Sequence, residues 1–295
     1  MRIAFLMFLA AFFTGCGSEP LVEIEAEPEP GPPSTDISLF EWSGSEVRFV
    51  TKISDRDGYD NQPSFSPDGA QVLFTSDRTG STDTYSFTLD SGTVTQLTST
   101  AEREYSPKTM RGDRSEYFSV VRQDTTGAQE LWVYPLDSKS EPRQLIDTDS
   151  VAYYTWVGDD QILFWRLGNP RTLRLFNENT SIESVISPGA VFSLQRIPGE
   201  RASSYLIEYE DDSSEIRKFN WETASTVHLA PTLGDGQDFA VAPDGRLLMM
   251  MGSELYTYRP GQTEGWELVA DLGVQEGTRL AVSPDGKFLA VVGSR

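Results

Sequence analysis

Few side chains in this sequence can support acid–base or nucleophilic chemistry. His228 is the one histidine of the chain and Cys16 its one cysteine, and both metal binding and general acid–base catalysis rely heavily on imidazole. A histidine pair for zinc and an internal disulfide are therefore excluded. His228 lies in an alternating polar stretch, residues 225–229, which we interpret as an exposed strand. We predict no catalytic residue, no metal site and no cofactor.

Carboxylates offer a second kind of chemistry, because paired acids hydrolyse glycosides and clustered hard oxygens bind calcium. The stretch Asp55-x-Asp57-Gly58-x-Asp60 has the character of a calcium loop, but it lacks the later glutamate and the helices of an EF-hand. The pairs Asp159-Asp160 and Asp211-Asp212 have no histidine or third ligand beside them. We interpret these acids as solvated loops and keep calcium as the alternative for the first stretch.

A third group of residues suits non-covalent recognition of a protein or a glycan, because it combines aromatic rings with charges of both signs. Its members fall in five short stretches at the starts of predicted strands. They are Tyr59, Asp60, Asn61, Arg103, Glu104, Tyr105, Tyr153, Tyr154, Gln237, Asp238 and Arg279. A purely local role, in which each residue stabilises its own loop, is the alternative.

Charge and length narrow the choice of partners. The 295 residues carry 45 acids against 24 bases, a formal net charge of -21. Nucleic acid and anionic lipid surfaces repel such a chain, so we exclude them as main partners. The apolar content, 38% of the residues, suffices for a substantial core in one large domain or two small ones.

The first residues have the pattern of a lipoprotein leader. A basic start, Met1-Arg2, precedes an apolar run from Ile3 to Phe13, which is shorter than the about 20 residues of a membrane-spanning helix. Phe13-Thr14-Gly15-Cys16 resembles the bacterial lipobox, in which the cysteine receives a lipid. By the rule for enteric lipoproteins, Gly17 in place of aspartate implies the outer membrane, facing the periplasm. A simple signal peptide with an incidental cysteine is the alternative.

We therefore divide the chain into three parts. Residues 1–15 form the signal peptide, and residues 16–35 form an acidic tether rich in proline and glutamate that begins at the lipidated Cys16. The composition of the tether is typical of extended, disordered chain. Residues 36–295 form the folded domain.

A turn motif recurs through the folded domain. Ser66-Pro67-Asp68-Gly69 reappears as Ala242-Pro243-Asp244-Gly245 and Ser283-Pro284-Asp285-Gly286, each followed by an apolar, strand-like run. Proline presets the first turn position and Asp-Gly allows the tight reversal, so each copy predicts a hairpin. Weaker copies occur around Gly112, where Arg111-Gly112-Asp113 is read as a turn, and around Gly158 and Gly199.

The spacing of these turns predicts a β-propeller. Successive markers at positions 68, 112, 158, 199, 244 and 285 are 44, 46, 41, 45 and 41 residues apart, a period typical of four-stranded propeller blades. Each of the first five units has a second turn, at residues 90–92, 137–139, 177–179, 221–223 and 260–262. The sixth stops after two strands, and residues 36–42 and 45–53 supply the two missing ones. We predict an all-β, six-bladed propeller closed by its N- and C-terminal strands.

Residues 59–98 resemble the WD40-like repeat of the TolB family of periplasmic propellers. The matching elements are Pro63-x-Phe65-Ser66-Pro67-Asp68-Gly69, Phe74-Thr75-Ser76, Asp83-x-Tyr85 and Gln96-Leu97-Thr98. The resemblance is strongest in the first, fifth and sixth units. It implies a propeller in the cell envelope. TolB has a further domain where this chain has the tether, so we expect a TolB-like protein other than TolB and do not carry over its binding to Pal.

In a propeller, the turns described above lie on one face and the loops leading into the innermost strands lie on the other. We call the latter the rim loops: residues 57–62, 102–105, 151–154, 236–238 and 276–279. They would bring the third group of residues to one channel mouth. We therefore expect a monomeric, non-catalytic, lipid-anchored scaffold that binds an envelope protein or a surface glycan there. The alternative is an enzyme that processes glycans or peptides at the same mouth.

Overall fold

The structure, a computed structural model, describes residues 33–137 and 140–295. The predicted signal peptide, Cys16 and nearly all of the tether lie outside these residues, and so does part of the predicted turn at residues 137–139. Within the described ranges, no helix is long and apolar enough to cross a membrane. One short 3-10 helix, η1 (Gly112–Arg114), accompanies a fold built otherwise from strands.

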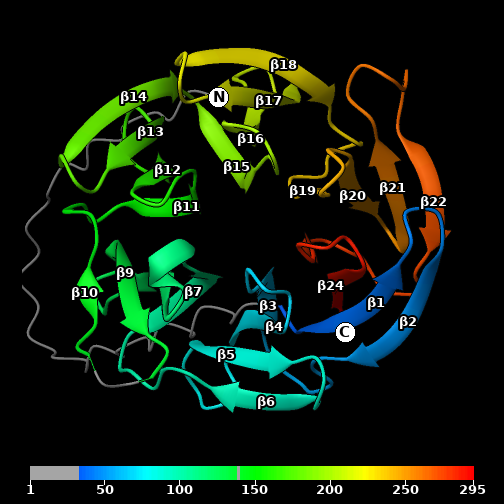
Figure 1. Ribbon diagram of the computed structural model, residues 1–295, viewed down its shortest axis with the longest axis horizontal. Coiled ribbons are helices and arrows are strands. Elements are labelled where there is room, and N and C mark those ends of the chain that lie inside the picture. The colour runs from blue at the N-terminus through cyan, green and yellow to red at the C-terminus, as the bar shows by residue number, and fades with distance from the viewer. Residues whose placement is uncertain (1–32, 138–139) are drawn as a thin grey trace, which may run out of the picture. The chain divides into compact units, whose positions relative to one another are not determined.

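Six four-stranded antiparallel sheets surround a central axis like the blades of a propeller (Figure 1). The innermost strands are β3 (Asp60–Phe65), β7 (Arg103–Thr109), β11 (Val151–Trp156), β15 (Ala190–Arg196), β19 (Ala240–Val241) and β23 (Leu280–Val282). The second strands are β4 (Gln71–Ser76), β8 (Tyr117–Gln123), β12 (Gln161–Arg166), β16 (Ala202–Glu208), β20 (Leu247–Met251) and β24 (Phe288–Ser294).

The third strands are β5 (Asp83–Thr88), β9 (Gln129–Pro135), β13 (Thr172–Asn177), β17 (Ser214–Asn220), β21 (Glu254–Tyr258) and β1 (Thr35–Trp42). The outermost strands are β6 (Thr93–Gln96), β10 (Arg143–Gln144), β14 (Ile182–Pro188), β18 (Ser225–Pro231), β22 (Glu267–Asp271) and β2 (Val47–Lys52). Blades 1 to 5 start with β3, β7, β11, β15 and β19, and blade 6 has the order β2-β1-β24-β23. The predicted six-bladed propeller is confirmed.

The recurring turn forms the hairpin between the first and second strands of a blade, as predicted. In blade 1, the Ser66 hydroxyl donates to the Asp68 carboxylate at 2.6 Å and accepts from the Gln71 amide at 2.9 Å. Gly69 has a φ of +74°, a left-handed conformation that favours glycine. These bonds fix the reversal locally, which is why the four-residue motif marks blades 1, 5 and 6 clearly in sequence.

Six apolar clusters hold the blades together among the described residues, one at each joint between neighbouring blades. At the joint of blades 6 and 1, for example, Ile37 and Leu39 lie with Val72 and Phe74, all at most 2% exposed. Alternation along each strand sends successive side chains to opposite faces of the blade. Each blade is therefore covered by apolar contacts on both faces.

The seam of the ring lies inside blade 6. Strand β1 pairs with β24 from Thr35 opposite Ser294 to Glu41 opposite Phe288, and the two strands lie side by side in Figure 1. The predicted closure is confirmed, with β1 beginning one residue before the expected Asp36 and β2 shorter than the expected residues 45–53. A side-chain bond reinforces the seam, because Arg295 Nη1 donates to the Asp36 carboxylate at 3.3 Å.

Candidate functional site: the central channel

Two adjoining chambers lie along the propeller axis. The narrow chamber, about 70 Å³, lies among the first residues of the innermost strands, near the rim loops. The wide chamber, about 320 Å³, lies among the last residues of the same strands and the recurring turns. Pro63, Lys108, Gln195 and Leu280 line both. We call the two ends of the channel the rim-loop end and the turn end.

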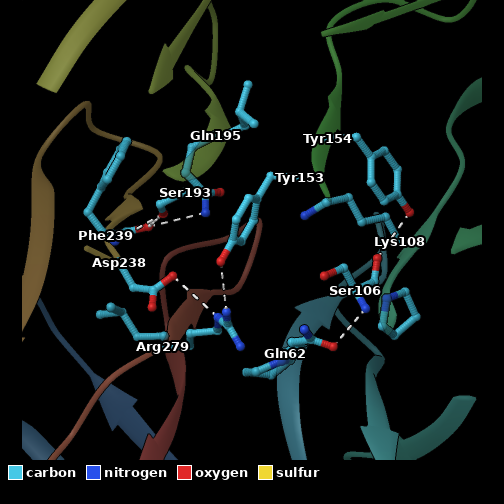
Figure 2. A pocket seen from close by; sticks show the side chains of 14 residues that line it. Gln62, Ser106, Lys108, Tyr153, Tyr154, Ser193, Gln195, Asp238, Phe239 and Arg279 are labelled. Atoms are coloured by element: carbon cyan, nitrogen blue, oxygen red, sulfur yellow. Dashed lines mark hydrogen bonds and ion pairs between the residues drawn. The ribbon is translucent and has the colours of Figure 1, made fainter. Parts of the chain in front are cut away.

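Arg279 forms the centre of the rim-loop end (Figure 2). Its guanidinium donates to the Asp238 carboxylate at 3.3 Å, to the Asn61 amide oxygen at 3.2 Å and to the Tyr153 hydroxyl at 3.3 Å. These residues come from blades 6, 5, 1 and 3, and blades 3 and 6 face each other across the ring. We call this arrangement the Arg279 knot. It ties four blades together over the axis.

Electrostatics stabilise the charged form of Arg279. Burial lowers the pKa of this guanidinium, but Asp238, Tyr153 and Tyr59 together outweigh burial and raise the pKa above its usual range. Burial also raises the pKa of the Tyr59 phenol, and the positive charge of Arg279 opposes that increase. At the centre of the knot, Arg279 is therefore a permanent cation beside one carboxyl side chain and two tyrosines.

Aromatic packing sets the position of Tyr153 in the knot. Its ring stacks on Trp165 with centroids 5.9 Å apart, and it meets the edge of Phe192 at 6.1 Å. Trp165 is fixed in turn by a bond from its indole nitrogen to the Gly189 carbonyl at 3.1 Å. The phenol that crosses the channel is thus held by the joint between blades 3 and 4.

Other predicted site residues turn inward, which matches the alternative of a local role. Asp60 is fully buried and bonds Arg56 at 2.9 Å and Arg78 at 3.1 Å. Glu104 is also fully buried, where it accepts from Thr100 at 2.9 Å, and burial raises its pKa. The Tyr154 hydroxyl lies 2.7 Å from the Ser119 carbonyl, and Tyr59 is 7% exposed. These four side chains offer a partner little surface.

Two predicted residues remain open to solvent at the rim-loop end. Arg103, the first residue of β7, is exposed and forms no ion pair with the described residues. Gln237 is exposed and makes one long hydrogen bond, 3.5 Å, to Glu208. Tyr105 is half-buried beside the cluster between blades 2 and 3. The structure therefore brings the knot residues together and leaves these three around them.

The sequence interpretation missed a set of residues at bulges in the innermost strands. Gln62, Ser106 and Ser193 occupy equivalent positions in blades 1, 2 and 4, all with positive φ. Each lies where its strand has one residue more than its neighbour, the mark of a β-bulge. The Gln62 side chain accepts from the Ser106 amide at 2.8 Å, and Ser193 binds the Phe239 backbone. The bulges thus bond neighbouring blades.

Lys108 is the most unusual of the missed residues. Its ammonium group points into the channel in Figure 2 and lies 5.8 Å from the centre of the Tyr154 ring. It forms no ion pair with any described carboxylate. Burial, reinforced by repulsion from Arg279, lowers the pKa of Lys108 to about 8. An alignment of the six repeats at their turns would have placed Lys108 level with Ser64 and Gln195, which also line the channel.

The acidic stretch considered for calcium has its carboxylates occupied by basic side chains. Asp60 is held by two arginines, Asp55 lies 2.8 Å from Lys52, and Asp57 lies 3.4 Å from Arg295. In the part of the chain that the structure describes, no group of three or more metal-ligating side chains is placed to hold an ion.

His228 lies far from the channel in the fold. It is on β18, the outermost strand of blade 4, where its exposed ring pairs with Glu215. Burial raises the pKa of Glu215, but bonds from Tyr209, His228 and Arg217 outweigh burial and lower the pKa to about 2. The expectation of an exposed strand residue is confirmed.

Comparisons with known proteins identify the fold. No protein-family model matches the sequence, and no curated protein is significantly similar to it. A candidate TolB from Agrobacterium tumefaciens superposes with a TM-score of 0.71 at 13% identity, over 90% of this chain and 99% of that one. TolB from Acinetobacter baumannii gives 0.58 at 13% identity, over 90% of this chain and 65% of that one. The fold is that of the TolB-like six-bladed propellers.

Enzymes share the same architecture. An oligogalacturonate lyase from Vibrio parahaemolyticus has a TM-score of 0.54 at 14% identity, over 88% of this chain and 97% of that one. A puromycin-hydrolysing peptidase from Mycobacterium tuberculosis has 0.58 at 14% identity, over 86% of this chain and 50% of that one. At such identities the likeness concerns fold alone, so the function must be argued from the channel itself.

Proposed function

We propose that this TolB-like six-bladed propeller is a non-catalytic binding scaffold of the bacterial cell envelope. A lipid on Cys16 would hold the monomer to the outer membrane on its periplasmic side, and the acidic tether would keep the propeller off that surface. The partner is another envelope protein, with a surface glycan as the second choice. It docks at the rim-loop end of the channel.

The Arg279 knot is the observation that carries this proposal. By joining four blades over the axis, it fixes the rim loops of blades 1, 3, 5 and 6 in one arrangement before any partner arrives. Fixed loops lose little conformational freedom on binding, which favours affinity. Exposed Arg103 and Gln237 and half-buried Tyr105 surround this rigid centre with charge, amide and ring, the chemistry of a protein interface.

The positions of the titratable groups favour binding over catalysis. The one histidine lies on an outer strand, away from the channel. At the rim-loop end, the Asp238 carboxylate is engaged by Arg279, and the buried Glu104 accepts hydroxyl bonds from Thr98 and Thr100. A carboxylate mechanism needs one acid and one base on either side of a substrate, and these two acids already hold structural bonds. Turnover of a captured glycan or peptide would contradict this part of the proposal.

The experiment that tests the docking surface is crosslinking of the native protein in envelope membranes, followed by capture and identification of partners. The protein must first partition with the membranes, as lipidation requires. We expect Arg103→Ala combined with Gln237→Ala to reduce capture about tenfold, since losing interface contacts of this kind costs about 1–2 kcal/mol. The melting temperature should stay unchanged because both side chains are exposed.

A matched pair on the opposite face serves as the control. Arg201 and Lys287 lie beside the recurring turns and have side chains 71% and 73% exposed, so Arg201→Ala with Lys287→Ala removes the same kind of surface. Arg246 is unsuitable for this purpose, because it is buried and joins blade 5 to blade 6 through the Gly44 carbonyl. Loss of capture in the control pair, with normal capture in the rim-loop pair, would move the docking surface to the turn face.

A further inference from the structure

The lining of the wide chamber has an unusual charge balance. Its ionisable residues are Lys108, Arg111 and Arg196, and no aspartate or glutamate is among the lining residues. This contrasts with the whole chain, in which acids outnumber bases by 45 to 24. A concave, low-dielectric wall of one sign concentrates its field inside the hollow. The wide chamber is therefore a local positive region in a negative protein.

None of the three cations is neutralised by an ion pair within the described chain, whereas most other described lysines and arginines pair with acids. The Nε of Arg196 is buried and has no hydrogen-bond partner. Burial, and then the charge of Arg196, lower the pKa of Arg111, while Asp159 in the neighbouring turn opposes this. Buried donors normally find partners inside the protein, so the Arg196 Nε lacks a partner that a ligand could supply. Lys108 is half-buried, and Arg111 is exposed at the turn end, where its guanidinium is free to meet a ligand.

The shape and lining of the chamber define the partner. Two guanidinium groups can each bind a carboxylate or phosphate through parallel hydrogen bonds, and Lys108 adds a point charge at the inner end. The remaining wall combines apolar side chains, including Phe65, Trp156 and Val241, with hydroxyl and amide groups such as those of Thr155 and Gln195. A volume of about 320 Å³ lies at the small end of the range for small-molecule sites. It suits a compact molecule better than a peptide or a glycan chain.

We propose that the wide chamber binds a small organic anion bearing two or more carboxylate or phosphate groups, held by Lys108, Arg111 and Arg196. The ligand enters from the turn end of the channel, and its apolar body lies against Trp156 and Phe65. This site is at the opposite end of the channel from the docking surface proposed above and does not depend on it.

Isothermal titration calorimetry of the full chain in detergent at low salt tests the site, with citrate and inorganic phosphate as probes. We expect citrate to bind with one-to-one stoichiometry, and the phosphate titration to show whether the chamber prefers carboxylate or phosphate oxygens. Arg196→Ala should weaken binding at least about tenfold, because a charged hydrogen bond to a buried anion is lost. Lys108→Met should do the same while the protein stays folded.

Lys287→Met is the control, since it removes an exposed cation from the same face. It should leave binding within about twofold of the unmodified protein, because exposed charges contribute little at short range. Failure of both probes to bind the unmodified protein would overturn the proposal. So would equal weakening by Lys287→Met and Arg196→Ala, which would indicate general attraction to a surface. Neither result bears on partner capture at the rim-loop end.

Discussion

The two ends of the channel are built from the same six strands but treat their charges in opposite ways. At the rim-loop end, Arg279 is surrounded by Asp238, Asn61 and Tyr153, so its charge is used to hold blades together. At the turn end, Lys108, Arg111 and Arg196 face a larger space with no acid in its lining. The cation at the rim-loop end has partners within the protein, whereas the three cations at the turn end form no ion pair with the described residues.

This difference separates a structural use of charge from a functional one. Removing one member of a buried ion pair lowers the free energy of unfolding, because the other member is left uncompensated. A buried cation that never had a partner lowers it as well, so its removal should raise the free energy of unfolding. Proteins retain such unfavourable groups where function requires them, and stability is lost in exchange. The comparison therefore predicts that substitutions at the two ends will change stability in opposite directions.

The largest effect is expected at the rim-loop end. Arg279→Ala should lower the free energy of unfolding by about 3 kcal/mol, because it removes the guanidinium that bonds the half-buried Asp238 carboxylate, the buried Asn61 amide and the Tyr153 hydroxyl across the channel. Urea denaturation followed by tryptophan fluorescence measures the change. A loss below about 0.5 kcal/mol, the level of an ordinary surface substitution, would show that the knot does not hold the blades and would break the comparison.

An opposite and smaller effect is expected for Lys108→Met, which should raise the free energy of unfolding by about 2 kcal/mol at neutral pH. The pKa of Lys108 is about 8 in the folded protein against an ordinary value of 10.5, so the unfolded chain binds the proton more tightly. The destabilisation is full below pH 8 and disappears as the pH rises towards 10.5.

The gain in stability of Lys108→Met over the unmodified protein should therefore shrink as the pH rises from 8 to 10.5. Melting temperatures of both proteins across this range test the point, with Lys287→Met as an exposed control that should show no such trend. A methionine variant less stable than the unmodified protein at pH 7 would mean that Lys108 has a favourable partner, and the contrast between the two ends would fail.

The smallest effect is expected from loss of the single hydrogen bond between Arg279 and Tyr153. Tyr153→Phe removes the hydroxyl that accepts from Arg279 but keeps the stacking on Trp165. We expect a loss of about 1 kcal/mol, the usual net contribution of one hydrogen bond. The shift of the urea midpoint measures this loss, and the dependence of the unfolding free energy on urea concentration should stay unchanged. A loss as large as that of Arg279→Ala would place most of the knot's contribution in this one bond across the channel.

The blade architecture could be predicted because its signals are local. Ser66, Asp68 and Gly69 satisfy one another within a single turn, so each repeat carries its own evidence for a hairpin. The seam followed from the same repeats, since two strands were missing at one end and available at the other. The spacing of the turns therefore determined six blades without knowledge of any long-range contact.

The channel could be predicted only in part, because its contacts are not local. The rim loops were placed correctly, but the sequence does not show that Asp60 would meet Arg78 and turn inward. Lys108 was missed because a bulge at Ser106 shifts the register of β7 by one residue. Simple alternation fails after a bulge, since each later side chain changes face.

The seam in blade 6 also makes the order of synthesis matter for assembly. Asp36 and Arg295, which pair there, are 259 positions apart in the chain. Blades 1 to 5 are each continuous in sequence and can form in turn as the chain emerges, but β1 and β2 must wait for residues 288–294. Until then the apolar faces of Ile37 and Leu39 have no second strand beside them. Closing so long a loop is slow, and unpaired strand edges favour aggregation. We therefore expect the nascent chain to be prone to aggregation from the synthesis of β1 until β24 pairs with it.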